Sequence, residues 1–499
     1  MSARVRDAAI VVGGLVAAVA LRVWILSGDL GRAESDESVV GLMALAIRDG
    51  ARPYMFFGQN YGGTLEPAIT GMVFKVVDPS SLTLKLVPVV LAGVCAVLVW
   101  RIGRRIVSEQ AARVAGALFL LFPPLFVWWS TKARGFYWVQ TALVLGVLLV
   151  GLRVLERVER GDRARLELGA LGLLAGLAWW TSPQTTFVLL AFGAWLAYRA
   201  RAAWRDWWFV VVGFALGALP WLRWNLAHDW ASFDTPPVPE STYFDRLEQF
   251  FTRMLPQMLG LRLIFSGDWR GGPIGALIYC ALLAAFGATL VWWWRHRTEH
   301  PAVEPLLAIA VVYPFVYAIA PTSYHPGDPR YLLLLAPIVV LLVAVLLTTW
   351  WRQLAMLGFA VILSVVSTNN VEDQANELGL VDVVPRNVDP LVEKLEELDI
   401  DFAYADYWAA YVLTYATGRA ILATPVDNVR DSAIDVAVAG VYPSTYVLFR
   451  GSPRDAGLPA ALEADGVGYE RYEAGGYAVY VLDRNYIPSK FPPGYWATH

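Results

Sequence analysis

The chain has 499 residues, of which 57% are hydrophobic and 17% charged, against roughly 25% charged residues in an ordinary soluble domain. The formal net charge is −3, so no basic excess points to a nucleic-acid partner. The mean hydropathy is +0.48, and the apolar residues fall in blocks of about 20, the length that crosses a ~30 Å hydrocarbon core. These properties exclude a soluble enzyme and predict a polytopic α-helical membrane protein.

The apolar blocks predict about eleven membrane spans, an odd number that puts the two termini on opposite sides of the bilayer. The first block follows Arg4 and Arg6 as in a signal sequence, but the many blocks behind it favour an uncleaved first helix. The predicted spans cover residues 8–27, 82–100, 110–129, 136–152, 166–182, 184–199, 207–226, 274–294, 303–320, 331–350 and 353–368.

Arginine-rich loops alternate with arginine-poor ones along the chain. By the positive-inside rule the arginine-rich side is cytoplasmic, and it includes the N-terminus. The opposite side then holds the long segments 28–81 and 227–272 and the C-terminal tail. The arginines that set this orientation are Arg4, Arg6, Arg101, Arg104, Arg105, Arg153, Arg157, Arg160, Arg163, Arg165, Arg199, Arg201, Arg205, Arg295, Arg297 and Arg352.

A change of composition divides the chain into two domains. Residues 1–368 are expected to form the transmembrane domain, with outer-face loops 28–81 and 227–272. In residues 369–499 Asp, Glu, Pro and Gly return, and strand-like and helix-like patterns alternate, which predicts an extracytoplasmic α/β domain. The expected strands are 402–405, 420–423, 445–449 and 477–482, and the expected helices are 392–398 and 459–464.

Two adjacent carboxylates, Asp36 and Glu37, follow the first span. From Ser38 onward apolar residues recur at helical spacing, which predicts a short amphipathic helix at the membrane surface. A structural interpretation makes Ser35 or Asp36 the cap of this helix, with Glu37 favouring its dipole. A functional interpretation makes the pair a general base held at the bilayer interface. Spacing alone favours the cap.

Aromatic residues at two places suggest contacts with a sugar. Tyr61 and Glu66 lie in a loop that combines aromatic and amide side chains with paired glycines, which suits a sugar site, although an ordinary turn explains the glycines equally well. In the tail, Tyr407, Tyr411 and Tyr415 share one helical face. Core packing is the favoured explanation of that face, and a platform for a glycan acceptor is the alternative.

Cations lie on the side that the positive-inside rule depletes. Lys132 and Arg134 occupy a very short outer loop, and Arg330 opens a late span. Such cations either snorkel to lipid headgroups or bind a phosphate at the depth of the interface, since guanidinium groups match phosphate oxygens. Beside them, Tyr331 is a candidate for the phosphate, and Tyr137 and His325 are candidates for the substrate.

These segments together resemble the GT-C superfamily over residues 8–368. The resemblance rests on the acidic pair after the first span, on Arg-x-x-Tyr from Arg134 to Tyr137, and on Pro-Arg-Tyr-Leu at 329–332. GT-C proteins are integral-membrane glycosyltransferases that use polyprenyl-phosphate sugars, and they include bacterial relatives of protein O-mannosyltransferases and aminoarabinose transferases. The resemblance implies that Asp36 is the catalytic base with Glu37 as companion, and that Arg330 contacts the donor phosphate.

The implied activity is an inverting transfer from a polyprenyl-phosphate sugar to a cell-wall glycan, a glycolipid or a protein outside a bacterial plasma membrane. Some members of the superfamily add a divalent cation, so Mg²⁺, Mn²⁺ or Ca²⁺ is left open here. No spacing among the acidic and imidazole groups of the outer loops is diagnostic of a metal site. These groups are Glu34, Asp36, Glu37, His228, Asp229 and Asp268.

Two other functions compete with an enzyme. A transporter or flippase of a lipid-linked sugar needs many spans and interfacial cations, but the predicted spans are nearly free of charge, which favours chemistry at one face. A non-catalytic envelope assembly protein explains the tail but gives Asp36, Glu37 and Arg330 no role.

Overall fold

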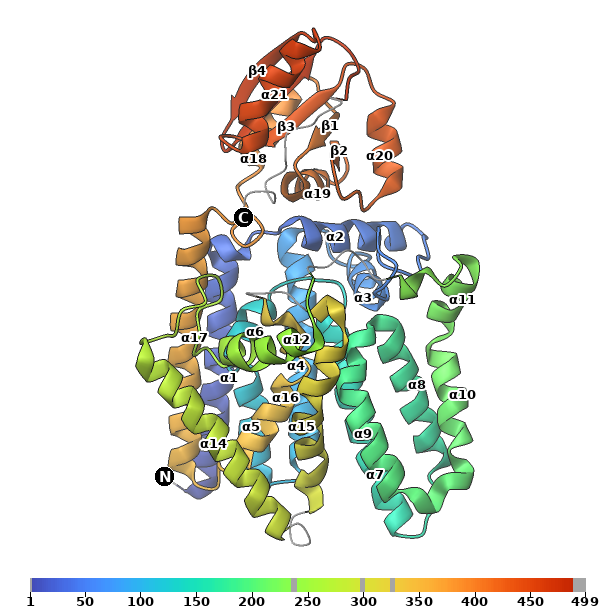
Figure 1. Cartoon of the computed structure of the whole chain (residues 1–499), viewed down its shortest axis with the longest axis vertical. Coiled ribbons are helices and arrows are strands. Elements are labelled where there is room, and N and C mark those ends of the chain that lie inside the picture. Colours follow the sequence, from blue (N-terminus) through green and yellow to red (C-terminus); the bar gives the residue numbers. More distant parts are fainter. Residues whose placement is uncertain (1, 235–239, 297–300, 324–327, 488–499) are drawn as a thin grey trace.

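A helical bundle carries a small α/β domain at one end, and the N-terminus lies at the other end (Figure 1). This computed structural model describes residues 2–234, 240–296, 301–323 and 328–487. The bundle helices are α1 (Ala3–Ser27), α2 (Ser35–Arg48), α3 (Leu65–Val73), α4 (Ser81–Gly103), α5 (Glu109–Phe119), α6 (Pro124–Trp129), α7 (Tyr137–Glu159), α8 (Arg165–Thr181), α9 (Thr186–Arg199), α10 (Trp208–Gly217), α11 (Leu219–Ala227), α12 (Tyr243–Gln249), α13 (Leu255–Met258), α14 (Pro273–His296), α15 (Glu304–Ile319), α16 (Ala336–Ala344) and α17 (Trp350–Leu378).

Shorter turns connect these helices. One of them, η5 (Phe250–Met254), is π-helical and continues α12 into α13. The others are 3₁₀ turns: η1 (Asp29–Gly31), η2 (Pro183–Thr185), η3 (Arg201–Asp206), η4 (Ala231–Phe233), η6 (Pro301–Val303), η7 (Pro321–Ser323) and η8 (Pro329–Leu332).

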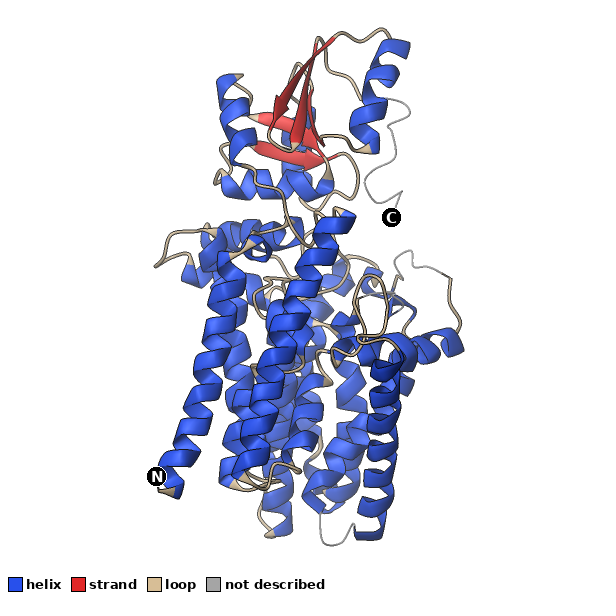
Figure 2. Ribbon diagram, turned by 90° about the vertical axis from the view of Figure 1, so that its left-hand side faces the viewer, coloured by secondary structure: helices blue, strands red, loops and turns tan. Residues whose placement is uncertain are grey.

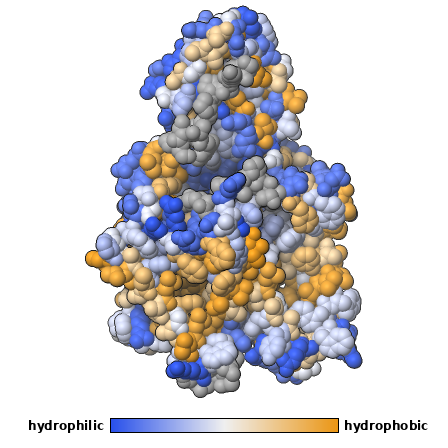
Figure 3. All heavy atoms as spheres, viewed as in Figure 1, coloured by the Kyte–Doolittle hydropathy of each residue, from blue (hydrophilic) through white to orange (hydrophobic). Residues whose placement is uncertain are grey.

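Five of the described helices, α1, α4, α7, α14 and α17, are long and apolar enough to cross a membrane, and the bent pair α10–α11 makes a sixth if it counts as one span. The first of them shows the expected division of faces: Gly14 and Ala18 are buried in the bundle, whereas Val12, Val16 and Val19 point outward. Figure 3 shows apolar residues gathered around the middle of the bundle. The chain is therefore a multi-pass membrane protein.

Two of the predicted spans that the structure does not confirm as continuous helices are interrupted beside prolines. A proline inside a helix removes one backbone donor and clashes with the preceding turn. The predicted span 110–129 is divided into α5 and α6 at Pro123 and Pro124, and 207–226 bends by 59° between α10 and α11, beside Pro220. The predicted span 331–350 contains η8 and the nine-residue α16.

The arginine-rich loops meet at the end of the bundle away from the α/β domain. Arg105 pairs with Glu156 at 2.6 Å and Arg199 with Glu304 at 3.0 Å, so four helix ends are tied together there. The α2–α3 segment and the α/β domain lie at the opposite end (Figures 1 and 2). This arrangement fits the predicted sidedness of the loops.

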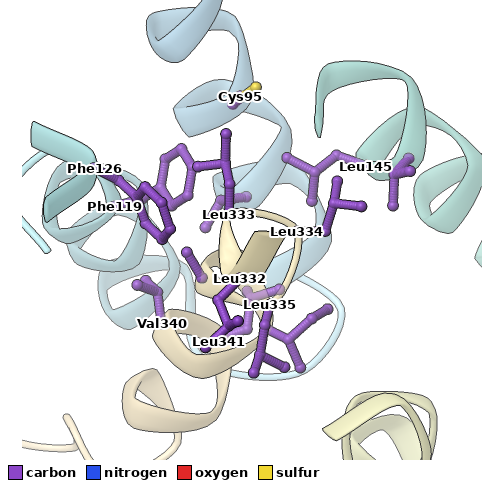
Figure 4. Packing of buried hydrophobic residues seen from close by; sticks show 14 of the residues in the cluster. Cys95, Phe119, Phe126, Leu145, Leu332, Leu333, Leu334, Leu335, Val340 and Leu341 are labelled. Carbon is purple, nitrogen blue, oxygen red and sulfur yellow. The ribbon is translucent and has the colours of Figure 1, made fainter. Parts of the chain in front are cut away.

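The apolar run 332–335, which begins at the last residue of η8, packs among buried side chains of several bundle helices (Figure 4). These leucines are at most 4% exposed and belong to one buried cluster with Cys95 on α4, Phe119 on α5, Phe126 on α6 and Leu145 on α7. Within a membrane bundle such leucines stabilise the packing of the helices through van der Waals contact, because lipid tails are as apolar as leucine. The run therefore fixes the position of the η8 turn just ahead of it.

The α/β domain has a five-stranded mixed sheet in the order β2-β1-β3-β5-β4. Strand β1 pairs in parallel with β2 and β3, while β5 runs antiparallel to both β3 and β4. The sequence therefore predicted the class of this domain and four of its strands, and missed β4. Its elements are α18 (Asp389–Glu397), β1 (Phe402–Ala405), α19 (Tyr407–Ala416), β2 (Leu422–Pro425), α20 (Ser432–Ala439), β3 (Thr445–Phe449), α21 (Pro453–Ala464), β4 (Tyr469–Ala474) and β5 (Tyr477–Leu482).

The helix predicted after the first span is α2, and it is buried rather than free at a surface. It packs on α3 on one side and on α19 of the α/β domain on the other. At the closest approach, a Cβ atom on Gly41 would lie 2.5 Å from the ring of Tyr415. Arg419 also donates a hydrogen bond to the carbonyl of Leu42 at 3.2 Å. Helix α2 thus joins the two domains.

We expect Gly41→Ala to lower the free energy of unfolding by about 1–3 kcal/mol, because the added methyl group must displace a buried tyrosine ring where α2 packs on α19. Gly93→Ala is the matched control, since a Cβ atom on Gly93, also helical, meets nothing within 4 Å. Thermal unfolding of the detergent-purified variants measures the difference. An equal or higher midpoint for Gly41→Ala than for Gly93→Ala would contradict the close packing of α2 on α19.

Candidate functional site

The predicted site residues gather around the N-terminus of α2, where Glu34 is the cap. Its carboxylate accepts the N–H groups of Asp36 at 2.8 Å and Glu37 at 3.2 Å, and the Glu37 carboxylate accepts the N–H of Glu34 at 3.3 Å. This reciprocal box satisfies N–H groups that the helix leaves free. The prediction that Ser35 or Asp36 caps the helix was wrong, and the Asp36 side chain is free for other partners.

Asp36 is held by groups from two distant parts of the chain, while a quarter of its side chain stays exposed. Its Oδ2 accepts a hydrogen bond from Nη1 of Arg134 at 2.6 Å. Its Oδ1 accepts one from the hydroxyl of Tyr407 and lies 3.8 Å from Nη2 of Arg430, both in the α/β domain. The carboxylate therefore lies where the bundle and the α/β domain meet.

The surroundings keep Asp36 ionised. Burial raises its pKa, but the charges of Arg134 and Arg430, with the hydrogen bond from Tyr407, outweigh burial and bring the pKa below its ordinary value. Arg330 lowers the pKa further through its charge. A carboxylate in this state is able to accept a proton or a hydrogen bond at neutral pH.

Arg134 connects the two carboxylates at the start of α2. Its guanidinium lies 3.0 Å from Glu34 and 2.6 Å from Asp36, and it sits 5.6 Å from the ring centroid of Trp129. Burial raises the pKa of Glu34 to about 7, although the charge of Arg134 opposes that rise. Glu34 therefore titrates near neutral pH, whereas Asp36 stays charged.

Two buried carboxylates hold the turn that presents Arg134. Glu37 accepts the N–H of Ala133 at 2.9 Å, and Glu66 accepts the N–H of Gly135 at 3.1 Å. Gly135 has a φ of +86°, and a Cβ atom there would lie 2.3 Å from an aromatic ring, so the turn needs glycine. The backbone on both sides of Arg134 is thus fixed by α2 and α3, which directs the guanidinium toward Asp36.

Glu37 lies beneath the site and not on its open face. Nζ of Lys85 is 2.6 Å from both Glu37 oxygens, and Nζ of Lys132 is 3.8 Å away, with all three side chains at most 1% exposed. The charges of Lys85 and Lys132 outweigh burial and lower the pKa of Glu37. Lys132 also lies 5.3 Å from the ring centroid of Trp128. Glu37, predicted as the companion of the base, and Lys132, predicted to bind the donor phosphate, are therefore both buried beneath the turn.

Arg330 comes to the site from η8. It pairs with Asp328 at 2.7 Å and lies 5.8 Å from the ring centroid of Tyr331, and 23% of its side chain is exposed. Its charge acts on Asp36 and on the buried phenol of Tyr137, the first residue of α7. The structure thus pairs one predicted phosphate-binding arginine, Arg134, directly with Asp36, and it brings the other, Arg330, within range for its charge to act on the same carboxylate.

Among the predicted substrate contacts that the structure describes, Tyr61 is the one with an open face. It is 39% exposed, and its ring packs edge-on against Phe136 at 6.4 Å between centroids. Burial raises its pKa, while the charges of Arg430 and Arg330 lower it. The phenol therefore lies near the arginines that surround Asp36.

Glu66, another predicted substrate contact, is only 1% exposed and lies under the turn. One of its oxygens is used by Gly135, and the second is buried without a hydrogen-bond partner among the described residues. Burial raises the pKa of Glu66 to about 8, so the group holds a proton at neutral pH. His325 lies outside the described residues.

Two members of the site, Tyr407 and Arg430, were missed by the sequence analysis. Tyr407 opens α19 and had been assigned to core packing, and Arg430 lies in the loop between β2 and α20. Nε of Arg430 donates to the hydroxyl of Tyr407 at 3.2 Å, and the amide of Gln59, oriented with its oxygen toward Arg430, accepts at 3.0 Å. No local pattern marks Arg430, because its role arises only from the docking of the two domains.

The predicted oxygen and imidazole ligands do not gather in the described part of the chain, where no group of three His, Cys, Asp or Glu residues is placed to hold a metal ion. Glu34 and Glu37 are occupied by helix capping and by ion pairs. His228 stacks on Trp224 at 4.3 Å between ring centroids. Use of a divalent cation stays an open expectation.

A cavity of about 560 Å³ lies between the outer ends of α1 and α4 and the α/β domain. Two arginines line it, but Arg32 pairs with Asp29 at 2.9 Å and Arg386 donates to the carbonyl of Gly476. Its lining does not include Asp36. The arginines around Asp36, which flank an exposed carboxylate, make the better candidate for a reaction site.

Comparison with known proteins identifies the fold. No family model matches the chain, and no curated protein matches it in sequence. Among solved structures, ArnT from Cupriavidus metallidurans bound to undecaprenyl phosphate superposes with a TM-score of 0.60 at 14% identity, covering 97% of this chain and 99% of ArnT. The chain shares its overall fold with ArnT, a member of the GT-C superfamily.

A second GT-C structure gives the same result. The oligosaccharyltransferase from Archaeoglobus fulgidus, tethered with an acceptor peptide, has a TM-score of 0.50 at 12% identity and covers 97% of this chain and 74% of its own. ArnT in the apo state also matches at 0.60, covering 93% and 96%. The GT-C-like fold expected from the acidic pair and the outer arginines is thereby confirmed.

The protonated state of Glu66 predicts a pH-dependent stability. Because the pKa of Glu66 is about 8 in the folded chain and near its ordinary value of 4.5 in the unfolded chain, the folded state binds more protons between these values. The free energy of unfolding therefore falls by about 1.4 kcal/mol per pH unit from this group as the pH rises toward 8. Glu66→Gln keeps the acceptor for Gly135 and is expected to remove that slope.

Thermal unfolding at pH 6, 7 and 8 measures the slope. The exposed Glu377→Gln serves as control and should keep the wild-type slope. If Glu66→Gln and wild type lose stability in parallel across this range, Glu66 is ionised and the assignment is wrong.

Proposed function

We propose that the chain is an inverting glycosyltransferase that moves a sugar from a polyprenyl-phosphate donor to an acceptor outside the plasma membrane. One observation carries the proposal. An ionised, partly exposed carboxylate, Asp36, is paired with Arg134 and lies within the electrostatic influence of Arg330, at the end of the bundle that bears the α/β domain. A base and phosphate-binding cations at a membrane face are the groups that such a transfer needs.

The fold supports a lipid-phosphate donor. The superposition on ArnT bound to undecaprenyl phosphate extends over nearly the whole of both chains. A polyprenyl tail stays in the bilayer, so the reacting phosphate lies at the interface. Helix α1 ends at Ser27 before Asp36, α4 carries Lys85 in its second turn, and α7 begins at Tyr137 just after Arg134, which supports a site at that depth.

The transfer assigns one task to each group. The acceptor hydroxyl attacks the anomeric carbon, a new C–O bond forms, and its proton passes to Asp36. The bond from the anomeric carbon to the phosphate oxygen breaks, and the polyprenyl phosphate leaves with the electron pair. Arg330 and Arg134 stabilise the charge that grows on the phosphate. Attack from the face opposite the leaving group inverts the anomeric centre.

The sidedness of the loops supports a cytoplasmic N-terminus and an extracytoplasmic α/β domain, in a bacterial plasma membrane. The acceptor belongs to one of three classes, a cell-wall glycan, a glycolipid or a protein. In this scheme Asp36 accepts the proton and Arg330 binds the phosphate, so no step requires a divalent cation. Participation of Mg²⁺, Mn²⁺ or Ca²⁺ is tested by the effect of a chelator on transfer.

Asp36→Asn is expected to lower transfer by about 10²–10⁴-fold, because the amide cannot take the proton. The assay follows label from polyprenyl-phosphate arabinose, mannose and glucose in membranes that contain the protein, with and without chelator. Asp29→Asn is the matched control: Asp29 lies in the same outer segment, is half-exposed and pairs only with Arg32 in the described contacts. The control should retain wild-type transfer.

Three outcomes would contradict the proposal. Full activity in Asp36→Asn would remove the base from the mechanism. If no donor is consumed while labelled lipid changes leaflet, the protein is a transporter of a lipid-linked sugar; if neither occurs, an envelope assembly role replaces both.

A further inference from the structure

We propose that the α/β domain is half of the catalytic centre: its Arg430 binds the donor phosphate together with Arg134 and Arg330, and its Tyr407 positions Asp36. This inference rests on the proposed function and adds to it a role for the C-terminal domain. It assigns Arg430 as a phosphate-binding residue and Tyr407 as a positioning residue.

The contacts of Arg430 place it at the reacting carboxylate. Its side chain is 13% exposed, and Nη2 lies 3.8 Å from Oδ1 of Asp36. Nε donates to the hydroxyl of Tyr407 at 3.2 Å, while that hydroxyl donates to the same Oδ1. The guanidinium also lies 5.9 Å from the centroid of the Tyr407 ring. Arg430, Tyr407 and Asp36 thus form one hydrogen-bonded group across the domain boundary.

The loop that carries Arg430 is built to hold it there. The hydroxyl of Tyr411 accepts the backbone N–H of Arg430 at 2.6 Å and that of Asp431 at 3.2 Å. Asp431 in turn caps α20. From the bundle side, Gly58 approaches so closely that a Cβ atom on it would lie 2.6 Å from Cα of Arg430. Loop and bundle therefore fit against each other at this residue.

Charge explains why an anion belongs beside Arg430. Arg330 has a carboxylate partner at 2.7 Å and Arg134 has two within 3.0 Å, whereas the only carboxylate paired with Arg430 among the described residues is 3.8 Å away. Arg430 therefore has the least neutralised charge of the three. A phosphate oxygen brought between these guanidinium groups gains charge-assisted hydrogen bonds without first breaking a short ion pair of Arg430.

The same geometry couples the phosphate to the base. The positive charges proposed to bind the phosphate are those that lower the pKa of Asp36. A bound phosphate offsets part of that positive charge, so the carboxylate becomes a stronger base when the donor is in place. Tyr407, which occupies one lone pair of Oδ1, leaves the other for the acceptor hydroxyl.

The test begins with binding, independent of transfer. Farnesyl phosphate, a short polyprenyl phosphate, is titrated onto the full-length protein in detergent, with farnesol as the uncharged control. Arg430→Ala is expected to weaken farnesyl phosphate binding by about 10-fold or more and to leave farnesol binding unchanged. Arg430→Lys should recover part of the affinity. Arg450→Ala, an exposed arginine of the same domain, is the matched control and should bind like wild type.

Kinetic measurements then distinguish roles of Arg430 and Tyr407 in the reaction from a purely structural role in folding. Arg430→Ala is expected to raise KM for the donor by about 10-fold or more with a smaller change in kcat. Tyr407→Phe keeps the ring but removes the hydroxyl, so it should lower kcat and move the acidic limb of kcat/KM to higher pH. A purely structural role of Tyr407 would leave that limb where it is in wild type.

The outcomes distinguish failure of the role proposed for Arg430 from failure of the proposed glycosyltransferase function. If Arg430→Ala binds farnesyl phosphate as tightly as wild type, the role of Arg430 is wrong even when wild type transfers sugar. If both Arg430→Ala and Arg430→Lys fail to fold, Arg430→Gln, which retains two donors, takes their place, and equal binding there overturns the proposal. If phosphate binding depends on Arg430 but no sugar is transferred, the phosphate site stands and the proposed function fails.

Discussion

The structure depends on the cluster of ion pairs and hydrogen bonds, the Asp36 clasp, that holds the Asp36 carboxylate between Arg134 and the Tyr407–Arg430 pair. A carboxylate three-quarters removed from water is costly unless donors replace the lost hydration. Here the donors come from the turn between α6 and α7 and from the α/β domain. Neither domain alone provides them all, so docking of the domains and formation of the site are one event.

A second layer of charge supports this clasp. Beneath it, Glu37 and Glu66 fix the backbone on both sides of Arg134, and Lys85 neutralises Glu37. Buried ion pairs contribute little net stability compared with apolar residues of similar size, because desolvation offsets their attraction. Their role here is to set an orientation: they fix the turn so that Arg134 points at Asp36. The two supporting acids also differ in charge, since the lysines keep Glu37 ionised whereas Glu66 holds its proton.

The sequence was sufficient for the class of fold and for half of the site. Apolar block length predicted the membrane bundle, and strand periodicity predicted the tail domain, because both patterns are local. The adjacent acids and outer arginines indicated Asp36, Arg134 and Arg330, which the structure brings together. Span counting failed where prolines shorten or divide helices, as at Pro123 and Pro220, since hydropathy does not register a lost backbone donor.

What the sequence could not reveal is burial and docking. Glu37 and Glu66 have the residue type of a catalytic acid, and only their depth shows that they support the turn. Tyr407 follows a helical face that packing explains, and Arg430 lies in an unpatterned loop. Their meeting with Asp36 joins residues hundreds of positions apart in the chain. Such a contact follows from the arrangement of domains and not from any local motif.

The most direct test of this account is an experimental structure of the protein in lipid nanodiscs with a polyprenyl phosphate. The account predicts the phosphate in contact with Arg134, Arg330 and Arg430, beside the Asp36 carboxylate and within reach of Tyr61. A phosphate bound elsewhere, for example in the cavity near Arg32 and Arg386, with the clasp around Asp36 unchanged, would contradict it.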